Sequence, residues 1–214
     1  KWGKHIFWHS SAHILGQALE QEYGGYLTVG PALDNGFYYD MFVGQKKIND
    51  DDLAKLEKAV EGVSKADQQF DRVVMSKEDA LELFQDNPFK VQFIKDKIPD
   101  GGMTSAYKNG PLVDLCRGPH LPSTKNMGAI WLNKNSSCYW LGSNENDTLQ
   151  RVYGISFPDN KSLKQHKAFI EEAKKRDHRI IGKDQELYFF HSDYSAGSCF
   201  WMPHGKSYLH LHVI

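Results

Sequence analysis

The chain has 214 residues, of which 40% are hydrophobic and 25% charged, so its composition is that of a folded protein with a substantial core and not of a disordered segment. Its formal net charge of −1 at pH 7 provides no overall attraction for nucleic acid, so any RNA contact must come from a local basic patch. The sequence contains no apolar run of the roughly 20 residues that a membrane helix needs and no signal peptide, so we expect a cytoplasmic protein with no membrane partner.

Hydrophobic periodicity and turn residues predict the elements of the first half of the chain. Apolar residues recur at spacings of three and four from about His9 to Tyr23, which predicts a helix that Gly24 ends. Other spacings and caps predict a hairpin, two further helices and two strands. These are a hairpin over Leu27 to Phe42, helices over Asn49 to Asp67 and Lys77 to Phe84, and strands over Phe70 to Met75 and Lys90 to Ile94.

Short strand patterns separated by Gly, Pro, Asn and Asp clusters dominate the next part of the chain. The predicted strands cover Thr104 to Tyr107, Leu112 to Leu115, Gly128 to Asn133, Ser137 to Leu141 and Gln150 to Phe157. Together with the helices they indicate an α+β fold, an antiparallel sheet with flanking helices. A long charged helix over Ser162 to Arg179 and an aromatic strand over Leu187 to Phe190 follow.

Two segments each place two reactive side chains four residues apart. His9 and His13 project from one face of their predicted helix, about one turn from each other. Cys116 and His120 have the same spacing, but the Gly-Pro pair between them predicts a tight loop. A single histidine pair is more often a surface or core-edge feature, whereas a second pair favours convergence on one site.

The donor types of these four residues suit zinc, because neutral imidazole and thiolate are its usual ligands. A zinc protease is disfavoured, since Ser10 follows His9 where such enzymes need a glutamate base. Asp114 adds a carboxylate that would orient an imidazole or accept hydrogen bonds from a substrate amine, although a turn-forming aspartate fits the sequence equally well. The three cysteines of the chain are too sparse for a disulfide scaffold, so we expect reduced thiols.

Both segments resemble the editing domain of the threonyl-tRNA synthetase family. The matching runs are Trp8-His9-Ser10-Ser11-Ala12-His13-Ile14-Leu15-Gly16 and Asp114-Leu115-Cys116-Arg117-Gly118-Pro119-His120. Further similar runs follow in order and cover essentially the whole chain: Gly30-Pro31, Gly36 to Asp40, Leu149 to Ile155, Arg176 to Arg179 and Leu187-Tyr188. Lys134 to Ser137 and the Gly101-Gly102 insertion are more similar to the eukaryotic cytosolic branch than to the bacterial one.

The resemblance implies a fold like the second additional domain of threonyl- and alanyl-tRNA synthetases and a reaction, the hydrolysis of mischarged seryl-tRNA(Thr) at the tRNA 3′ end. The editing lysine of the family, in a Tyr/Phe-Lys-Val run, matches Lys90. The implied catalytic set is therefore His9, His13, Lys90, Asp114, Cys116 and His120. The family implies an editing site without a metal or other cofactor. If zinc is bound, its ligands are His9, His13, Cys116 and His120.

The resemblance also divides the chain, into an editing domain at 1–158, a charged linker helix at 159–183 and the truncated start of a class II synthetase catalytic domain at 184–214. A basic excess between Lys161 and Lys183 suits RNA phosphate, or an ordinary solvated connector. We expect a fragment that cannot aminoacylate tRNA, because the ATP site, a zinc site and the homodimer contacts belong to the missing catalytic part. The alternatives are a zinc-dependent hydrolase of the alanyl-tRNA editing type and a non-catalytic tRNA-binding module.

Overall fold

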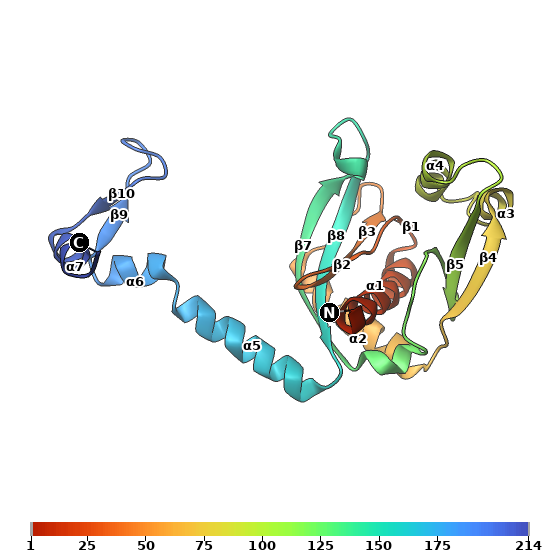
Figure 1. Ribbon diagram of the computed structural model, residues 1–214, viewed down its shortest axis with the longest axis horizontal. Helices are drawn as coiled ribbons and strands as arrows, with labels where there is room; N and C mark the ends of the chain where they lie inside the picture. The colour runs from red at the N-terminus through yellow and green to blue at the C-terminus, as the bar shows by residue number, and fades with distance from the viewer. Residues whose placement is uncertain (1, 214) are drawn as a thin grey trace. The chain divides into compact units, whose positions relative to one another are not determined.

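The computed structural model describes residues 2–213, and the chain divides between Leu163 and Lys164 into two compact units. The α+β class with antiparallel sheets and flanking helices is confirmed (Figure 1). Within the described range, no helix combines the length and the apolar character that crossing a membrane requires.

A five-stranded antiparallel sheet forms the centre of the first unit. Its strands follow the order β1 (Tyr26–Leu27), β3 (Gly36–Phe42), β8 (Thr148–Phe157) and β7 (Ala129–Tyr139), and β2 (Ala32–Leu33) pairs with β3. Helices α1 (Trp2–Tyr23) and α2 (Asp50–Lys65) contact each other and pack on this sheet (Figure 1). Their apolar faces and the sheet share one core, which includes Leu15, Phe37, Leu56 and Val152. This packing holds α1, and therefore both of its histidines, against the sheet.

A smaller antiparallel sheet in the order β4 (Asp71–Ser76), β5 (Met103–Asn109) and β6 (Leu112–Leu115) completes the first unit. Helices α3 (Lys77–Leu83) and α4 (Pro88–Lys97) belong to this part, and short helical turns η1 (Thr124–Met127) and η2 (Trp140–Gly142) flank β7. Ser76 caps α3, because its hydroxyl accepts the backbone N–H of Asp79 at 3.0 Å. Strand β6 leads directly into the loop that carries Cys116.

The strand predicted over Lys90 to Ile94 is wrong, because these residues lie in α4. The Asn87 side chain accepts the backbone N–H of Lys90 at 3.2 Å, and Pro88 at the first helical position has a φ that suits a helix. Val91, Phe93 and Ile94 favour a strand only by their type. The Asn87 cap and Pro88 outweigh this preference for a strand once the helix packs on a sheet.

Three other boundaries differ from the prediction. Helix α1 begins at Trp2, seven residues before the predicted start at His9, and its exposed first turn has no apolar periodicity. The two strands predicted between Gly128 and Leu141 form the single strand β7, whose pairing with β8 has an irregularity at Leu132 and Lys134. The long charged helix is two helices, α5 (Asn160–Lys175) and α6 (His178–Asp184), because the Asp177 side chain caps a new start.

The second unit contains a β-hairpin between short helices. Strands β9 (Tyr188–Phe190) and β10 (Cys199–Trp201) pair antiparallel, and α7 (Pro203–Val213) follows them. The predicted aromatic strand over Leu187 to Phe190 is confirmed as β9. Tyr188 packs its ring against the rings of Phe190 and Trp201, which gives the hairpin a small aromatic cluster.

Candidate functional site

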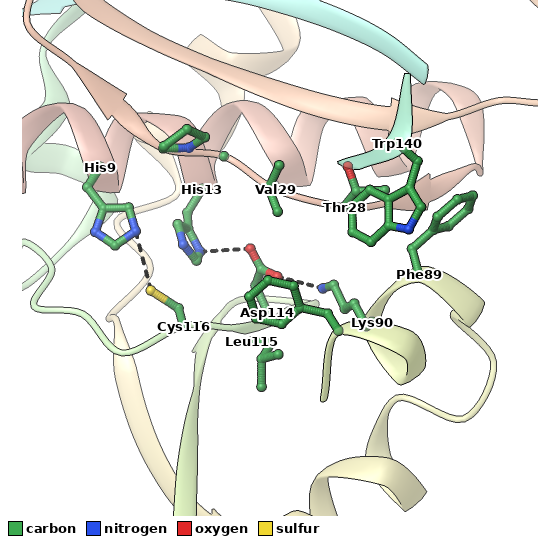
Figure 2. A pocket seen from close by; sticks show the side chains of 13 residues that line it. His9, His13, Thr28, Val29, Phe89, Lys90, Asp114, Leu115, Cys116 and Trp140 are labelled. Atoms are coloured by element: carbon green, nitrogen blue, oxygen red, sulfur yellow. Dashed lines mark hydrogen bonds and ion pairs between the residues drawn. The ribbon is translucent and has the colours of Figure 1, made fainter. Parts of the chain in front are cut away.

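A pocket of about 220 Å³ in the first unit collects side chains from α1, the segment between β1 and β3, α4 and the end of β6 (Figure 2). Five of the six predicted site residues line it: His9, His13, Lys90, Asp114 and Cys116. The sixth, His120, lies behind Cys116, with its Nε2 atom 3.2 Å from the sulfur. The two sequence pairs therefore converge on one place, and Lys90 joins them from a different element.

Asp114, on β6, is the charged centre of the pocket. Nζ of Lys90 donates to Oδ1 of Asp114 at 2.5 Å, and the hydroxyl of Tyr39 donates to Oδ2. Nδ1 of His13 lies 3.4 Å from the same Oδ2, close enough for a charge interaction when His13 is protonated, although the orientation does not make it a hydrogen bond. Burial acts to raise the pKa of Asp114, but the charges of Lys90 and His13 and the hydrogen bonds outweigh it and lower the pKa to about 2. Asp114 is therefore an ionised carboxylate.

Cys116 lies between two imidazoles. Its sulfur is 3.3 Å from Nε2 of His9 and 3.2 Å from Nε2 of His120, and the backbone N–H of Gly118 donates to it at 3.2 Å. Burial raises the pKa of the Cys116 thiol to about 12. Burial, with the neighbouring histidines, lowers the pKa of His9 to about 4 and that of His120 to about 2. At neutral pH the cluster is therefore a thiol between uncharged imidazoles.

Ser10 sets the tautomer of His120. Its hydroxyl donates to the carbonyl of Ile6 at 2.9 Å and accepts the backbone N–H of Leu121 at 2.9 Å. Since that one proton is used, the contact of 3.1 Å with His120 requires Nδ1 of the imidazole to donate. The lone pair of His120 Nε2 then points at Cys116. This role of Ser10 is not visible in the sequence, because it depends on contact with a loop 110 residues away.

The donor set fits a metal ion. One ligand atom from each of His9, His13, Cys116 and His120 lies within 4.8 Å of the others. The carboxylate of Asp114 beside His13 resembles the partner that orients a metal-bound imidazole. These four residues could therefore hold a metal such as zinc. Binding would have to remove the Cys116 proton, because the thiolate is the ligand.

Apolar side chains form much of the rest of the pocket wall (Figure 2). They come from Val29, Pro31, Phe89, Phe93, Leu115 and Trp140. Nε1 of Trp140 donates to Oε1 of Gln92 at 2.9 Å, and the Trp140 and Phe89 rings meet edge to face at 5.3 Å. These contacts hold α4, which carries Lys90, against the tip of the larger sheet.

Tyr39 is a second site residue that the sequence analysis did not single out. It lies fully buried on β3, and burial, with Asp114, raises the pKa of its hydroxyl well above the ordinary value, so the hydroxyl remains a donor. Gly16 and Gly30 leave room for its ring: a Cβ at either position would lie 2.7 Å or 2.3 Å from a ring carbon. The Gly-Pro and Phe-Tyr-Tyr runs were visible in the sequence, but nothing local connects them with Asp114.

Comparison with known proteins finds a matching family model and several similar proteins. Residues 104–153 match the family model described as the threonyl and alanyl tRNA synthetase second additional domain. Over 200 residues the chain is 52% identical to threonine--tRNA ligase 2, cytoplasmic, of Mus musculus, an alignment that covers 94% of this chain and 25% of that protein.

Two further relatives are also cytoplasmic threonine--tRNA ligases. The chain is 50% identical to threonine--tRNA ligase 1, cytoplasmic, of Homo sapiens, over 94% of its length and 27% of that protein. It is 48% identical to threonine--tRNA ligase, cytoplasmic, of Saccharomyces cerevisiae, over 95% of its length and 29% of that protein. The chain thus spans little more than a quarter of the length of these curated relatives, whose names agree with the cytoplasmic location expected from the sequence.

Proposed function

We propose that this chain, which belongs to the threonyl-tRNA synthetase family, hydrolyses the ester bond of seryl-tRNA(Thr) in the pocket around Asp114. The observation that carries the proposal is the buried pair of Lys90 and Asp114 beside the imidazoles of His9 and His13, in a pocket of about 220 Å³. Fixed charge next to uncharged imidazole suits the hydrolysis of a small ester.

Hydrolysis of the seryl ester would compensate for the limited selectivity with which a protein binds threonine in preference to serine. Serine differs from threonine by one methyl group, and a pocket that binds threonine excludes serine by only about 10 to 200-fold. A second site that hydrolyses the serine ester corrects the remaining errors if it is too small for the correct threonine ester. The apolar wall of Phe89, Phe93 and Trp140, in which Trp140 donates to Gln92, would set this steric limit.

We assign the six residues as follows. His9, uncharged at neutral pH, orients the attacking water and accepts its proton. Lys90, held as an ammonium ion by Asp114, attracts the negative charge that develops on the carbonyl oxygen. His13 binds the terminal ribose or the leaving oxygen, and Asp114 provides negative charge for the substrate α-ammonium. Cys116 lines the pocket, and His120 positions the Cys116 side chain through its Nε2 atom.

The direct test compares the deacylation of Ser-tRNA(Thr) and Thr-tRNA(Thr) by the intact chain and by a His9→Ala/Lys90→Ala variant. We expect rapid loss of the seryl ester, a stable threonyl ester, and loss of the activity in the variant. Lys95→Ala is the control, because this exposed lysine on α4 does not line the pocket. If the intact chain leaves Ser-tRNA(Thr) acylated as long as buffer does, the proposal fails.

Cys116→Ser is expected to change the hydrolysis rate by roughly tenfold or less, because a thiol whose pKa is raised to about 12 is not an attacking thiolate at neutral pH. Removal of an obligatory nucleophile lowers the rate by several orders of magnitude. Single-turnover deacylation distinguishes the two results. A trapped seryl thioester on Cys116 in the wild type would instead identify Cys116 as a nucleophile.

A zinc-dependent hydrolase is the second candidate, because the four donor atoms of His9, His13, Cys116 and His120 converge. Bound zinc would supply a Lewis acid for the ester carbonyl. Elemental analysis and chelation separate the two candidates, and we expect the chelated protein to retain its rate of hydrolysis. About one zinc per chain in the wild type, lost in Cys116→Ser together with the activity, would favour the zinc enzyme.

The rest of the chain fits a larger synthetase. We propose an editing domain at 1–158, a helical linker at 159–183, made of α5 and most of α6, that offers basic residues to the tRNA, and the start of a catalytic domain at 184–214. Threonine-tRNA ligation by ATP and dimerisation would belong to the full-length protein, of which this chain is about a quarter by comparison with its relatives. A non-catalytic tRNA-binding module is the outcome if tRNA binds and the ester stays intact.

A further inference from the structure

A second cavity, of about 460 Å³, adjoins the reaction pocket and shares part of its wall. Phe93, Leu115 and Cys116 line both spaces. The second cavity is completed by Lys97, Ile98, Thr104 and Arg117. Residues of α4 and of the end of β6 thus separate the reaction pocket from the second cavity. A ligand longer than an amino acid can occupy both spaces.

The charge of the second cavity differs from that of the first. In the reaction pocket, the cation Lys90 is neutralised by Asp114 at 2.5 Å. In the second cavity, Lys97 in the last turn of α4 and Arg117 in the loop after β6 are both exposed. Among residues 2–213, the part of the chain that the structure describes, no ion pair joins either cation to a carboxylate. Two unpaired cations at one cavity favour an anion.

The guanidinium of Arg117 indicates which kind of anion the second cavity favours. A guanidinium presents parallel N–H donors that match the oxygens of a phosphate, and a nearby ammonium adds a point charge. An apolar floor of Phe93, Ile98 and Leu115 lies beside these donors, so the cavity suits a group that joins a phosphate to a less polar part.

We propose that Lys97 and Arg117 bind the phosphate on the 5′ oxygen of the terminal nucleotide of the RNA substrate. This inference rests on the proposed function, since it names the neighbour of the reacting ester. The ester is on a hydroxyl of the terminal ribose, and the same ribose carries this phosphate on its other side. With the ester beside Lys90, the phosphate is therefore one sugar away, which agrees with two cavities that share Cys116 and Leu115.

The test uses substrates that differ only in this phosphate: seryl-tRNA(Thr), 3′-O-seryl-adenosine, and 3′-O-seryl-adenosine carrying a 5′-phosphate. The variants are Lys97→Gln and Arg117→Gln. The matched control is Lys95→Gln, which also removes a cation from the last turn of α4 but does not line the cavity. Circular dichroism and unfolding midpoints confirm that all three variants fold.

Each cavity variant is expected to raise KM for the two phosphate-bearing substrates about tenfold, the effect of losing one charge-assisted hydrogen bond. The KM for phosphate-free seryl-adenosine and the kcat for all substrates stay as in the wild type. The slope of log(kcat/KM) for seryl-tRNA(Thr) against log salt falls by about one for each removed cation. Lys95→Gln behaves as the wild type with the two small substrates.

An unchanged KM for the phosphate-bearing substrates, or an equal loss with seryl-adenosine, would overturn the phosphate assignment while the hydrolase proposal stands. If the wild type hydrolyses none of the three, the hydrolase proposal fails, and calorimetric binding of adenosine 5′-monophosphate against adenosine still decides the subsite. Preferential binding of the monophosphate that both cavity variants abolish supports it. Equal binding of the two ligands overturns it.

Discussion

Replacement of Lys90 by methionine is expected to lower the rate of seryl-tRNA(Thr) hydrolysis at least about 100-fold and to lower the free energy of unfolding by about 3–5 kcal/mol. The side chains of Lys90 and Asp114 are each only 6% exposed, so the variant leaves an unpaired carboxylate in the interior. Single-turnover deacylation measures the first effect, and unfolding in urea measures the second. Lys95→Met, at an exposed position of the same helix, should change neither by a comparable amount.

A double variant separates the structural role of the Lys90–Asp114 pair from its role in catalysis. In Lys90→Met/Asp114→Asn the buried negative charge is gone, and the amide oxygen can still accept the Tyr39 hydroxyl. We expect most of the lost stability to return, because removing both charges of a buried pair costs far less than removing one. Hydrolysis should stay low. A double variant that regains the wild-type rate would show that Lys90 acts only through the stability of the fold.

Gly30→Ala is expected to destabilise the protein by about 1–3 kcal/mol and to slow hydrolysis by roughly tenfold. The added Cβ would lie 2.3 Å from a ring carbon of Tyr39, and Gly16 already approaches the same ring, so the ring has little room to move away. Displacement of the ring withdraws its hydroxyl from Asp114 and so disturbs the carboxylate that holds Lys90. Unfolding in urea and single-turnover deacylation measure the two effects.

Two variants serve as controls for this prediction. Gly62→Ala lies in α2, where an added Cβ meets no heavy atom within 4 Å, so we expect a gain in stability of about 0.5–1 kcal/mol and an unchanged rate. Tyr39→Phe keeps the ring and removes only the hydroxyl, and it should reproduce the kinetic defect of Gly30→Ala without its steric strain. If Gly30→Ala hydrolyses the ester at the wild-type rate, Tyr39 does not position Asp114.

For Lys90, the sequence predicts a place in the site, but only the structure decides that the residue lies in a helix. The resemblance of Phe89-Lys90-Val91 to the editing run of the family predicts Lys90 as a site residue, and in the structure its Nζ donates to Oδ1 of Asp114. The sequence also suggested a strand over Lys90 to Ile94, because aromatic and β-branched types such as Phe93 and Val91 are common in strands. These residues form a helix instead, because Asn87 caps its start and α4 packs against Trp140 at the end of β7.

The sequence by itself determined what depends on neighbours a few residues apart. Apolar spacing placed His9 and His13 on one helix face, Gly118 and Pro119 predicted the loop between Cys116 and His120, and alternating strands indicated an antiparallel α+β fold. The signature runs also identified the threonyl-tRNA synthetase family, which the comparisons confirm.

Only the tertiary structure decided the electrostatics of the pocket. Asp114 receives Lys90 from 24 residues away and Tyr39 from 75, and Ser10 orients His120 across 110 residues. Burial, which makes Cys116 a thiol and His9 a neutral imidazole, comes from the same distant elements. Desolvation and charge act through space, so the protonation states of the site arise only when α1, α4 and β6 pack together.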